Sequence, residues 1–253
     1  MQKSRKAAPL RIGTAGWGVP ARYADDFASE GTHLERYAQR LNGVEINSSF
    51  YRPHRRGVYE RWAAATAADF RFSVKVPKAM THERRLVDCA ALIDQFAEQV
   101  GGLGDKLGVL LIQLPPSATL KKRAADTFFR HLRNALDAPL ALEPRNPSWF
   151  APAVETWLAE RRIARVATDP SPKRVPDEAG PARPGGWDGL AYYRWHGSPR
   201  PYFSDYPIER LEMLRQRAAK ERRAGRTVWC IFDNTGAGHA LGNALWLTDT
   251  TAK

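Results

Sequence analysis

The sequence contains few cysteines, a deficit of acidic residues and no long apolar run. Cys89 and Cys230 are its only cysteines, which excludes a disulfide framework and a cysteine-rich zinc site and favours a reducing environment. No stretch approaches the roughly 18 apolar residues of a membrane-spanning helix, and no apolar segment follows the basic first residues as in an export signal. We therefore expect a cytoplasmic protein with no membrane partner.

Basic residues outnumber acidic ones by 39 to 27, which gives a formal net charge of +12 at pH 7. A basic surface attracts phosphate groups, so this composition suggests nucleic acid as a partner. The basic side chains are spread along the chain, in segments such as 209–226, rather than gathered in one arm. Because they are equally consistent with a solvated outer surface, nucleic-acid binding is the alternative hypothesis.

Short β-rich runs alternate with amphipathic stretches along the whole chain, which predicts repeated βα units and a parallel sheet. The predicted strands are 10–15, 43–47, 70–76, 108–114, 139–143, 164–169, 190–196 and 227–233. The predicted helices are 33–41, 58–67, 88–100, 120–136, 152–161 and 209–224. Eight strands with interleaved helices in 253 residues match a TIM (β/α)8 barrel, with a doubly wound open sheet as the alternative.

Two segments depart from the repeat. The stretch 170–188 is rich in proline and glycine and has no helical period, so an irregular loop replaces the helix after the sixth strand. Residues 1–9 precede the first strand and are predicted to form a flexible N-terminal extension. We expect one domain over residues 1–253.

Polar residues stand at the ends of the predicted strands. Alternation along the second strand places Val44 and Ile46 on the helix-covered face, so Glu45 and Asn47 face the interior. The other inward or strand-end residues are Lys75, Gln113, Glu143, Arg145, Asp169, Arg194, His196, Asp233 and Asn234. Because unpaired polar groups are costly inside a barrel, these residues must pair with one another or with a ligand.

Glu45 and Lys75 each allow two interpretations. Glu45, oriented by Asn47 and Tyr51, is a candidate general acid/base, or a buried carboxylate paired with Lys75. Lys75 is a candidate nucleophile toward a carbonyl substrate. Neighbouring carboxylates would keep it protonated, however, which favours a structural or anion-binding role.

The remaining candidates extend the same strand ends. Glu143 and Arg145 form a couplet in which Arg145 can bind a carboxylate or phosphate, and Glu143 is a further catalytic candidate or fixes Arg145. His196 is a candidate for proton transfer, because its side chain titrates near neutral pH. Further ligand contacts are expected from His82 and from the aromatic residues Tyr51, Trp149 and Tyr202, whose rings could stack on a sugar or base.

Some of the same residues are also candidate ligands for a divalent metal. Glu143, Asp169, His196 and Asp233 end four successive strands and are acceptable ligands. Arg145 and Arg194 would lie close to them and repel a cation. We therefore assign no cofactor, and metal-assisted chemistry belongs to the alternative hypothesis.

Several long segments carry a family resemblance. They are Gly13-Thr14-Ala15-Gly16-Trp17, Val44-Glu45-Ile46-Asn47-Ser48-Ser49-Phe50-Tyr51-Arg52-Pro53, Phe72-Ser73-Val74-Lys75-Val76-Pro77-Lys78, Leu142-Glu143-Pro144-Arg145, Tyr193-Arg194-Trp195-His196-Gly197 and Phe232-Asp233-Asn234. Through these segments the chain resembles the YecE-like family, known as domain of unknown function 72. The resemblance implies a TIM barrel and leaves the reaction open, with only a loose link to sugar isomerases.

The sequence thus predicts a TIM barrel whose mouth binds a small anionic or sugar-like ligand. We expect isomerase- or hydrolase-like acid/base chemistry, with Glu45 or His196 transferring the proton and Lys75, Arg145 and Arg194 stabilising negative charge. The alternative is a nucleic-acid-binding protein, with or without metal-assisted phosphodiesterase activity. A barrel that binds its ligand without catalysis is a third hypothesis, and the oligomeric state is left open.

Overall fold

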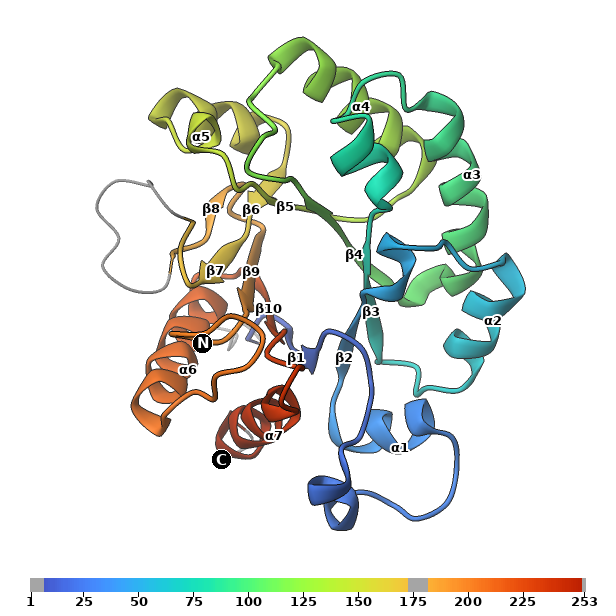
Figure 1. Cartoon of the computed structure of the whole chain (residues 1–253), viewed down its shortest axis with the longest axis vertical. Helices are drawn as coiled ribbons and strands as arrows, with labels where there is room; N and C mark the ends of the chain where they lie inside the picture. Colours follow the sequence, from blue (N-terminus) through green and yellow to red (C-terminus); the bar gives the residue numbers. More distant parts are fainter. Residues whose placement is uncertain (1–6, 173–181, 252–253) are drawn as a thin grey trace, which may run out of the picture.

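The computed structural model describes residues 7–172 and 182–251 as a mixed α/β domain, with strands gathered at the centre and helices outside them (Figure 1). The strands are β1 (Leu10–Thr14), β2 (Gly43–Ile46), β3 (Arg71–Lys75), β4 (Leu107–Gln113), β5 (Leu140–Glu143), β6 (Ile163–Arg165), β7 (Ala167–Asp169), β8 (Gly185–Gly186), β9 (Leu190–Trp195) and β10 (Thr227–Phe232). The helices are α1 (His33–Arg40), α2 (Arg56–Ala64), α3 (Ala90–Val100), α4 (Lys122–Ala135), α5 (Pro152–Glu160), α6 (Ile208–Arg223) and α7 (His239–Thr251). None of the helices in the described ranges is both long and apolar enough to cross a membrane.

Each predicted strand and helix has a counterpart, with differences at three places. The sixth predicted strand is divided into β6 and β7. The described part of 170–188 contains only the short β8, while residues 173–181 lie outside the described residues. Helix α7 was missed because Asp249 is its only charged residue and buried side chains such as Leu241 and Leu247 lie on several sides, so no polar face marks it.

The strands form two hydrogen-bonded sheets rather than the single closed sheet that the sequence predicts. Their orders are β1-β10-β9-β7 and β2-β3-β4-β5-β6-β8, and every pair is parallel except β6 with β8. The two sheets meet at β1 and β2 through one isolated bridge, between Ala15 and Glu45. They meet again where the sixth strand breaks at Val166, whose N–H donates to the Leu142 carbonyl before β7 turns to pair with β9.

Side chains take the place of backbone pairing between β1 and β2. The Ile12 N–H donates to Asn42 Oδ1 at 2.9 Å, and Asn42 Nδ2 donates to the Leu10 carbonyl at 2.8 Å. The Thr14 N–H donates to the Tyr37 hydroxyl at 2.9 Å. Because these groups already satisfy the free edge of β1, a continuous ladder to β2 is unnecessary and the sheet stays open there.

The start of the chain is held against this sheet. Residues 1–6 of the predicted N-terminal extension lie outside the described residues. The Ala8 carbonyl accepts from Arg222 Nε at 2.8 Å, and the Pro9 carbonyl accepts from the Val228 N–H at 2.9 Å. The chain is therefore anchored before β1 begins.

Alternation along the strands separates two apolar cores. Residues such as Val44, Phe72 and Leu110 face the helices and belong to the larger core. The opposite positions form a smaller cluster, which we call the interior core, of Val109, Leu111, Ala141, Ala164, Val166, Leu190, Tyr192, Trp229 and Ile231. Polar residues continue these inward positions toward the carboxyl ends of the strands.

Trp229 fills much of the interior core, and a neighbouring glycine makes room for it. A Cβ at Gly108 would lie 2.6 Å from Trp229 Cζ2, closer than side chains pack. The Tyr192 ring stacks on Trp229 with the two planes 11° apart. This floor positions the Tyr192 hydroxyl at the start of the polar layer above it.

Candidate functional site

A buried ion cluster lies directly above the interior core, and Arg194 on β9 is its centre. Its guanidinium contacts Glu45 from β2 twice, with Nη2 2.7 Å from Oε1 and Nε 2.9 Å from Oε2. It also contacts Glu143 from β5 at 3.2 Å and Asp233, which follows β10, at 3.0 Å. Burial would lower the pKa of Arg194, but Asp233, Glu45 and Glu143 raise it well above its usual value, so the guanidinium stays charged. We call these four residues with Tyr192 the inner network.

Glu45 is fully enclosed in this network. The Tyr192 hydroxyl lies 2.9 Å from both Glu45 Oε2 and Ser73 Oγ. Since a carboxylate only accepts, Tyr192 donates to Glu45 and accepts from Ser73. Glu45 therefore pairs with Arg194, not with Lys75 as one of the two interpretations supposed, and its contacts suit it to hold Arg194 in place.

Glu143 is similarly saturated by donors. Its Oε1 accepts from Arg145 Nη2 at 2.5 Å, from Arg145 Nε at 2.9 Å and from Gln113 Nε2 at 2.9 Å. Burial would raise the pKa of Glu143, but Arg145 and Arg194, with His196, hold it well below its usual range. Glu143 is consequently a weak base that fixes two guanidinium groups.

His196 lies between two of the carboxylates. Its Nδ1 is 3.0 Å from Asp233 Oδ2, and its Nε2 is 3.4 Å from Glu143 Oε1 and 3.2 Å from Arg145 Nη2. Burial opposes ionisation of Asp233, yet Arg194 and His196 lower its pKa below the usual value. An ionised Asp233 therefore holds the Nδ1 proton and turns Nε2 toward Arg145.

A second group of residues, which we call the rim, consists of Lys75, His82, Arg145 and Tyr202. The Lys75 ammonium makes no hydrogen bond or ion pair with any described residue, and it lies 4.1 Å from the centre of the Phe50 ring. Burial and Arg194 lower its pKa to about 8, against the opposing effect of Glu45, Glu143 and Asp233. The rim thus contains a cation without a carboxylate partner.

The loop between β9 and α6 holds Tyr202 over His196. Tyr202 has a φ of 70°, which is unusual for a residue other than glycine. Its N–H donates to the His196 carbonyl at 2.5 Å, and its carbonyl accepts from the Gly236 N–H at 2.8 Å. The Tyr202 ring then meets the His196 ring edge to face, with centres 5.7 Å apart. A strained backbone that is held by hydrogen bonds on both sides favours a functional role for the position of this ring.

Four other predicted residues lie elsewhere. The Asp169 side chain, at the end of β7, interacts with Tyr206 and with Arg210 on α6, and Asn234, which follows β10, donates through Nδ2 to Asn243 on α7. Trp149 is 1% exposed, and its indole N–H donates to the Ala118 carbonyl within the larger core. Tyr51 is 71% exposed and contacts Phe50 rather than the ion cluster.

The alternation rule could have found the residues that were missed. Counting back by two from Arg194 and Lys75 gives Tyr192 and Ser73, which both belong to the polar layer. The inward residue at the end of the sixth strand is Thr168 rather than Asp169, and its hydroxyl is enclosed without a hydrogen-bond partner. Phe50 carries no such signal, because its place under Lys75 depends on the turn after β2.

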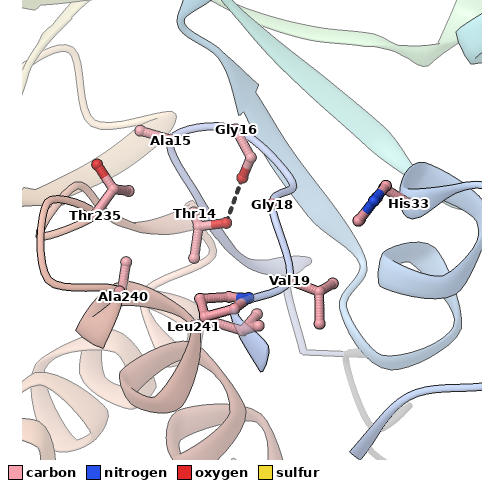
Figure 2. Close-up of a pocket in the computed structure, with 11 residues that line it drawn as sticks. Thr14, Ala15, Gly16, Gly18, Val19, His33, Thr235, Ala240 and Leu241 are labelled. Carbon is pink, nitrogen blue, oxygen red and sulfur yellow. Dashed lines mark hydrogen bonds between the residues drawn. The ribbon is translucent and has the colours of Figure 1, made fainter. Parts of the chain in front are cut away.

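Two cavities open beside β1. One, of about 430 Å³, lies between the loop after β1 and the start of α7, as Figure 2 shows for Thr14, Gly16 and Thr235. The other, of about 520 Å³, is lined by residues 15–18 with His33, Asn47 and Ser48. The Asn47 Oδ1 atom is enclosed and has no hydrogen-bond partner, so the second cavity borders an unsatisfied polar group.

Three of the four predicted metal ligands, Glu143, His196 and Asp233, lie together, but they are occupied by one another and by guanidinium groups. Within residues 7–172 and 182–251, no group of three His, Cys, Asp or Glu side chains is arranged to hold an ion. Glu143 and Asp233 face guanidinium groups instead, and Asp169 interacts with α6. Cys89 and Cys230 are both buried free thiols outside the cluster.

The fold and the cluster define an α/β protein with a buried ion network at the carboxyl ends of its parallel strands. The chain belongs to the family described as protein of unknown function DUF72, whose sequence profile matches residues 11–253. It is 32% identical over 148 residues to the UPF0759 protein YecE of Escherichia coli K12, a match covering 56% of this chain and only 53% of YecE. It is 26% identical to the UPF0759 protein YunF of Bacillus subtilis, over 92% of both chains.

Solved structures share the fold. A DUF72 family protein from Enterococcus faecalis superimposes with a TM-score of 0.77 at 20% identity, over 96% of both chains. A DUF72 family protein from Thermotoga maritima gives a TM-score of 0.76 at 22% identity, over 97% of this chain and all of the other. These similarities establish the fold and carry no activity with them.

Proposed function

We propose that this protein binds a small anionic or sugar-like ligand at the carboxyl ends of its strands and transforms it by acid/base chemistry. One observation carries the proposal. The rim cation Arg145 lies 3.2 Å from His196 Nε2, the Nδ1 of His196 is held by Asp233 at 3.0 Å, and the unpaired cation Lys75 interacts electrostatically with the same carboxylates. In parallel α/β folds, ligands bind at this end of the strands.

The proposal includes a TIM-barrel arrangement of the strands. The strand order supports it: β2 to β6 follow one another in one sheet, and β7, β9, β10 and β1 follow one another in the other. The bridge between Ala15 and Glu45 would complete the circle. In such a barrel the interior core is the floor, and the inner network and the rim form the layers above it.

The charge of the rim favours an anion. The three carboxylates of the inner network exceed the single positive charge of Arg194 by two, and the rim cations Arg145 and Lys75 balance that excess. Arg145 contacts Glu143 and His196 through Nε and Nη2, while its Nη1 makes no hydrogen bond with a described residue and its side chain is 28% exposed. A carboxylate or phosphate between Arg145 and Lys75 would supply the missing acceptor.

His196 is the group best placed to move a proton. An imidazole held by a buried carboxylate at one nitrogen can accept or donate at the other, and here that nitrogen lies beside Arg145. Glu45 and Glu143 act as positioning residues, because donors occupy their oxygens. Arg145 and Lys75 would stabilise negative charge that develops on the ligand.

Solvent exchange tests this function directly. The full chain is incubated in D2O with a panel of sugar phosphates and hydroxy acids, and deuterium incorporation is followed by proton NMR. We expect incorporation with the native chain and its loss in His196→Asn, with binding retained. No exchange together with no binding of any anion would overturn the proposal.

Exposed aromatic side chains favour a second candidate, a single-stranded nucleic acid. Tyr51, Tyr202 and Phe203 are 71%, 42% and 43% exposed, and rings near a basic surface can stack on bases. Binding of a fluorescent oligonucleotide should then weaken steeply between about 50 and 200 mM salt, as several phosphate contacts require. Binding that is absent or independent of salt removes this candidate.

A further inference from the structure

Lys75 differs from every other charged side chain of the polar layer, because its Nζ has no partner among the described residues. The residue is 6% exposed, and the ammonium lies over the face of Phe50 at 4.1 Å from the ring centre. Nζ is also absent from the fully enclosed polar atoms that lack a partner, so it keeps contact with solvent. A ligand bound at the mouth would therefore meet an ammonium group that is not already paired.

Burial also makes the uncharged amine accessible near neutral pH. With a pKa of about 8, about one Lys75 side chain in ten is neutral at pH 7, compared with fewer than about one in a thousand for an exposed lysine. The cause is the loss of hydration, together with Arg194, which outweighs the carboxylates of the inner network. A neutral amine is the nucleophilic form.

His82, in the turn η3 (Ala79–Glu83), lies close enough to this amine to interact with it, because burial and then the charge of Lys75 lower the pKa of His82. Its ring meets the same Phe50 ring, with centres 4.9 Å apart. Thr81 Oγ1 lies 3.2 Å from the Pro77 carbonyl and 2.9 Å from His82 Nδ1. If the single hydroxyl proton goes to the carbonyl, Nδ1 must be the donor to Thr81, which leaves the His82 Nε2 lone pair free.

Space for a ligand adjoins this position. Glu45 pairs with Ser73 in the register of β2 and β3, so the next inward positions, Asn47 and Lys75, are neighbours at the strand ends. Asn47 lines the cavity of about 520 Å³ and has an enclosed, unpaired Oδ1. Lys75 is not part of the cavity lining, so a ligand bound there would have to extend past Asn47 to meet the amine.

We infer that Lys75 forms a Schiff base with a small aldehyde or ketone that carries a carboxylate or phosphate, the anionic group being bound by Arg145. This inference rests on the proposed function and names its substrate class. A carbonyl carbon is the electrophile that an unpaired amine attacks, and the anion matches the rim cation beside it. The carboxylates of the inner network would then stabilise the positive iminium nitrogen.

The step balances without a further reactant. The Lys75 ammonium gives one proton to His82 Nε2, and the amine lone pair forms a C–N bond while the carbonyl π pair moves to oxygen. That oxygen takes the proton from His82. A second proton leaves the nitrogen by the same route, the C–O bond breaks, and water departs. The nitrogen keeps one hydrogen and its positive charge in the C=N bond.

Reductive trapping tests the inference. The full chain is treated with pyruvate and sodium borohydride at pH 7.5. Its intact mass is then measured by mass spectrometry, and the modified residue is located by peptide mapping. We expect one adduct per chain, on Lys75, formed at least about tenfold faster than on any other lysine. Lys75→Arg keeps the charge and should abolish it. The matched control Lys78→Arg, which changes an exposed lysine paired with Glu83, should label like the native chain.

A second measurement separates this inference from the proposed function. Calorimetry with lactate, which has the carboxylate but no carbonyl, reports anion binding alone. Binding of lactate with no trapping of pyruvate, or with adducts spread evenly over the lysines, overturns the Schiff base and leaves anion binding intact. Absence of both overturns the proposed function as well. Circular dichroism of Lys75→Arg shows whether the variant loses its label because it no longer folds. If it does not fold, NMR of the lysines in the native chain replaces the variant: a Lys75 that titrates near pH 8 supports the inference, and one that titrates near 10.5 overturns it.

Discussion

The two cations Arg194, in the inner network, and Lys75, in the rim, have opposite surroundings. Arg194 is 1% exposed and contacts three carboxylates. Lys75 is 6% exposed and contacts an aromatic ring but no carboxylate. One position is complete as it stands, while the other lacks a partner.

This difference separates the residues that hold the cluster together from those that are available to a ligand. A buried charge with all its partners has little left to offer a ligand, although removing it is costly because its partners stay buried. A buried charge without a partner is unfavourable unless something else uses it. The inner network therefore sets the positions, and the rim is where a ligand would be bound.

Breaking the inner network should have the largest effect. Arg194→Met leaves Glu45, Glu143 and Asp233 buried without their shared cation, so we expect a loss of about 3–5 kcal/mol in the free energy of unfolding at pH 7. Urea unfolding followed by circular dichroism measures it. A decrease in the free energy of unfolding below about 1 kcal/mol would show that Arg194 does not stabilise this layer.

Removing the unpaired cation should act in the opposite direction. Lys75 has its pKa lowered from 10.5 to about 8, so the folded state binds fewer protons, and the cost is fully present below pH 8 and vanishes above pH 10.5. Lys75→Met should therefore gain about 2–3 kcal/mol at pH 7. The gain should shrink between pH 8 and pH 10.5 when unfolding is measured across that range. A destabilised variant would mean that Lys75 supports the network.

Acid should weaken the inner network through its carboxylates. The pKa values of Glu143 and Asp233 are depressed in the folded chain below their usual 4.5 and 3.8, so their stabilisation is present above these values and is lost as the pH falls below them. Asp233→Asn keeps an oxygen for His196 and should lose stability less steeply below pH 4, while differing by about 1 kcal/mol at pH 7. Identical acid profiles would contradict this role of Asp233.

The smallest effect is expected at Tyr202. Tyr202→Gly relieves a left-handed backbone worth about 1 kcal/mol and removes an exposed ring, so stability should change by less than about 1 kcal/mol. Binding of a ring-bearing anion, measured by calorimetry, should nevertheless weaken several-fold, since the ring over His196 is lost. Unchanged affinity would limit the role of the rim to Lys75 and Arg145.

Much of the fold could be predicted because period and alternation are local signals. The inward series Glu45, Lys75, Glu143, Arg194 and His196 follows from counting by two along each strand, and all five lie in the polar layer. The predictions of Asp169 and Asn234 do not follow this rule, because counting by two from Val166 and Ile231 gives Thr168 and Asp233 as the inward residues at those two strand ends. The helix α7 was missed for lack of a polar face.

Partners within the layer could not be predicted, because they depend on three-dimensional distances between strands. Glu45 pairs with Arg194 rather than with Lys75, because Arg194 on β9 reaches it across the interior. Tyr192, which also contacts Ser73, occupies the same carboxylate. The opening between β1 and β2 was also hidden, since side chains of Asn42 and Tyr37 replace ladder hydrogen bonds there. Trp149 looked like a mouth residue only because it follows a strand closely in sequence.

A crystal structure grown in phosphate tests the central claim most directly, namely that the rim is an incomplete site for an anion. We expect density for a phosphate between Lys75 Nζ and the Arg145 guanidinium, with Arg194 still bound to its three carboxylates. Phosphate found only on the outer helices, with Lys75 paired to a carboxylate of the inner network, would contradict it.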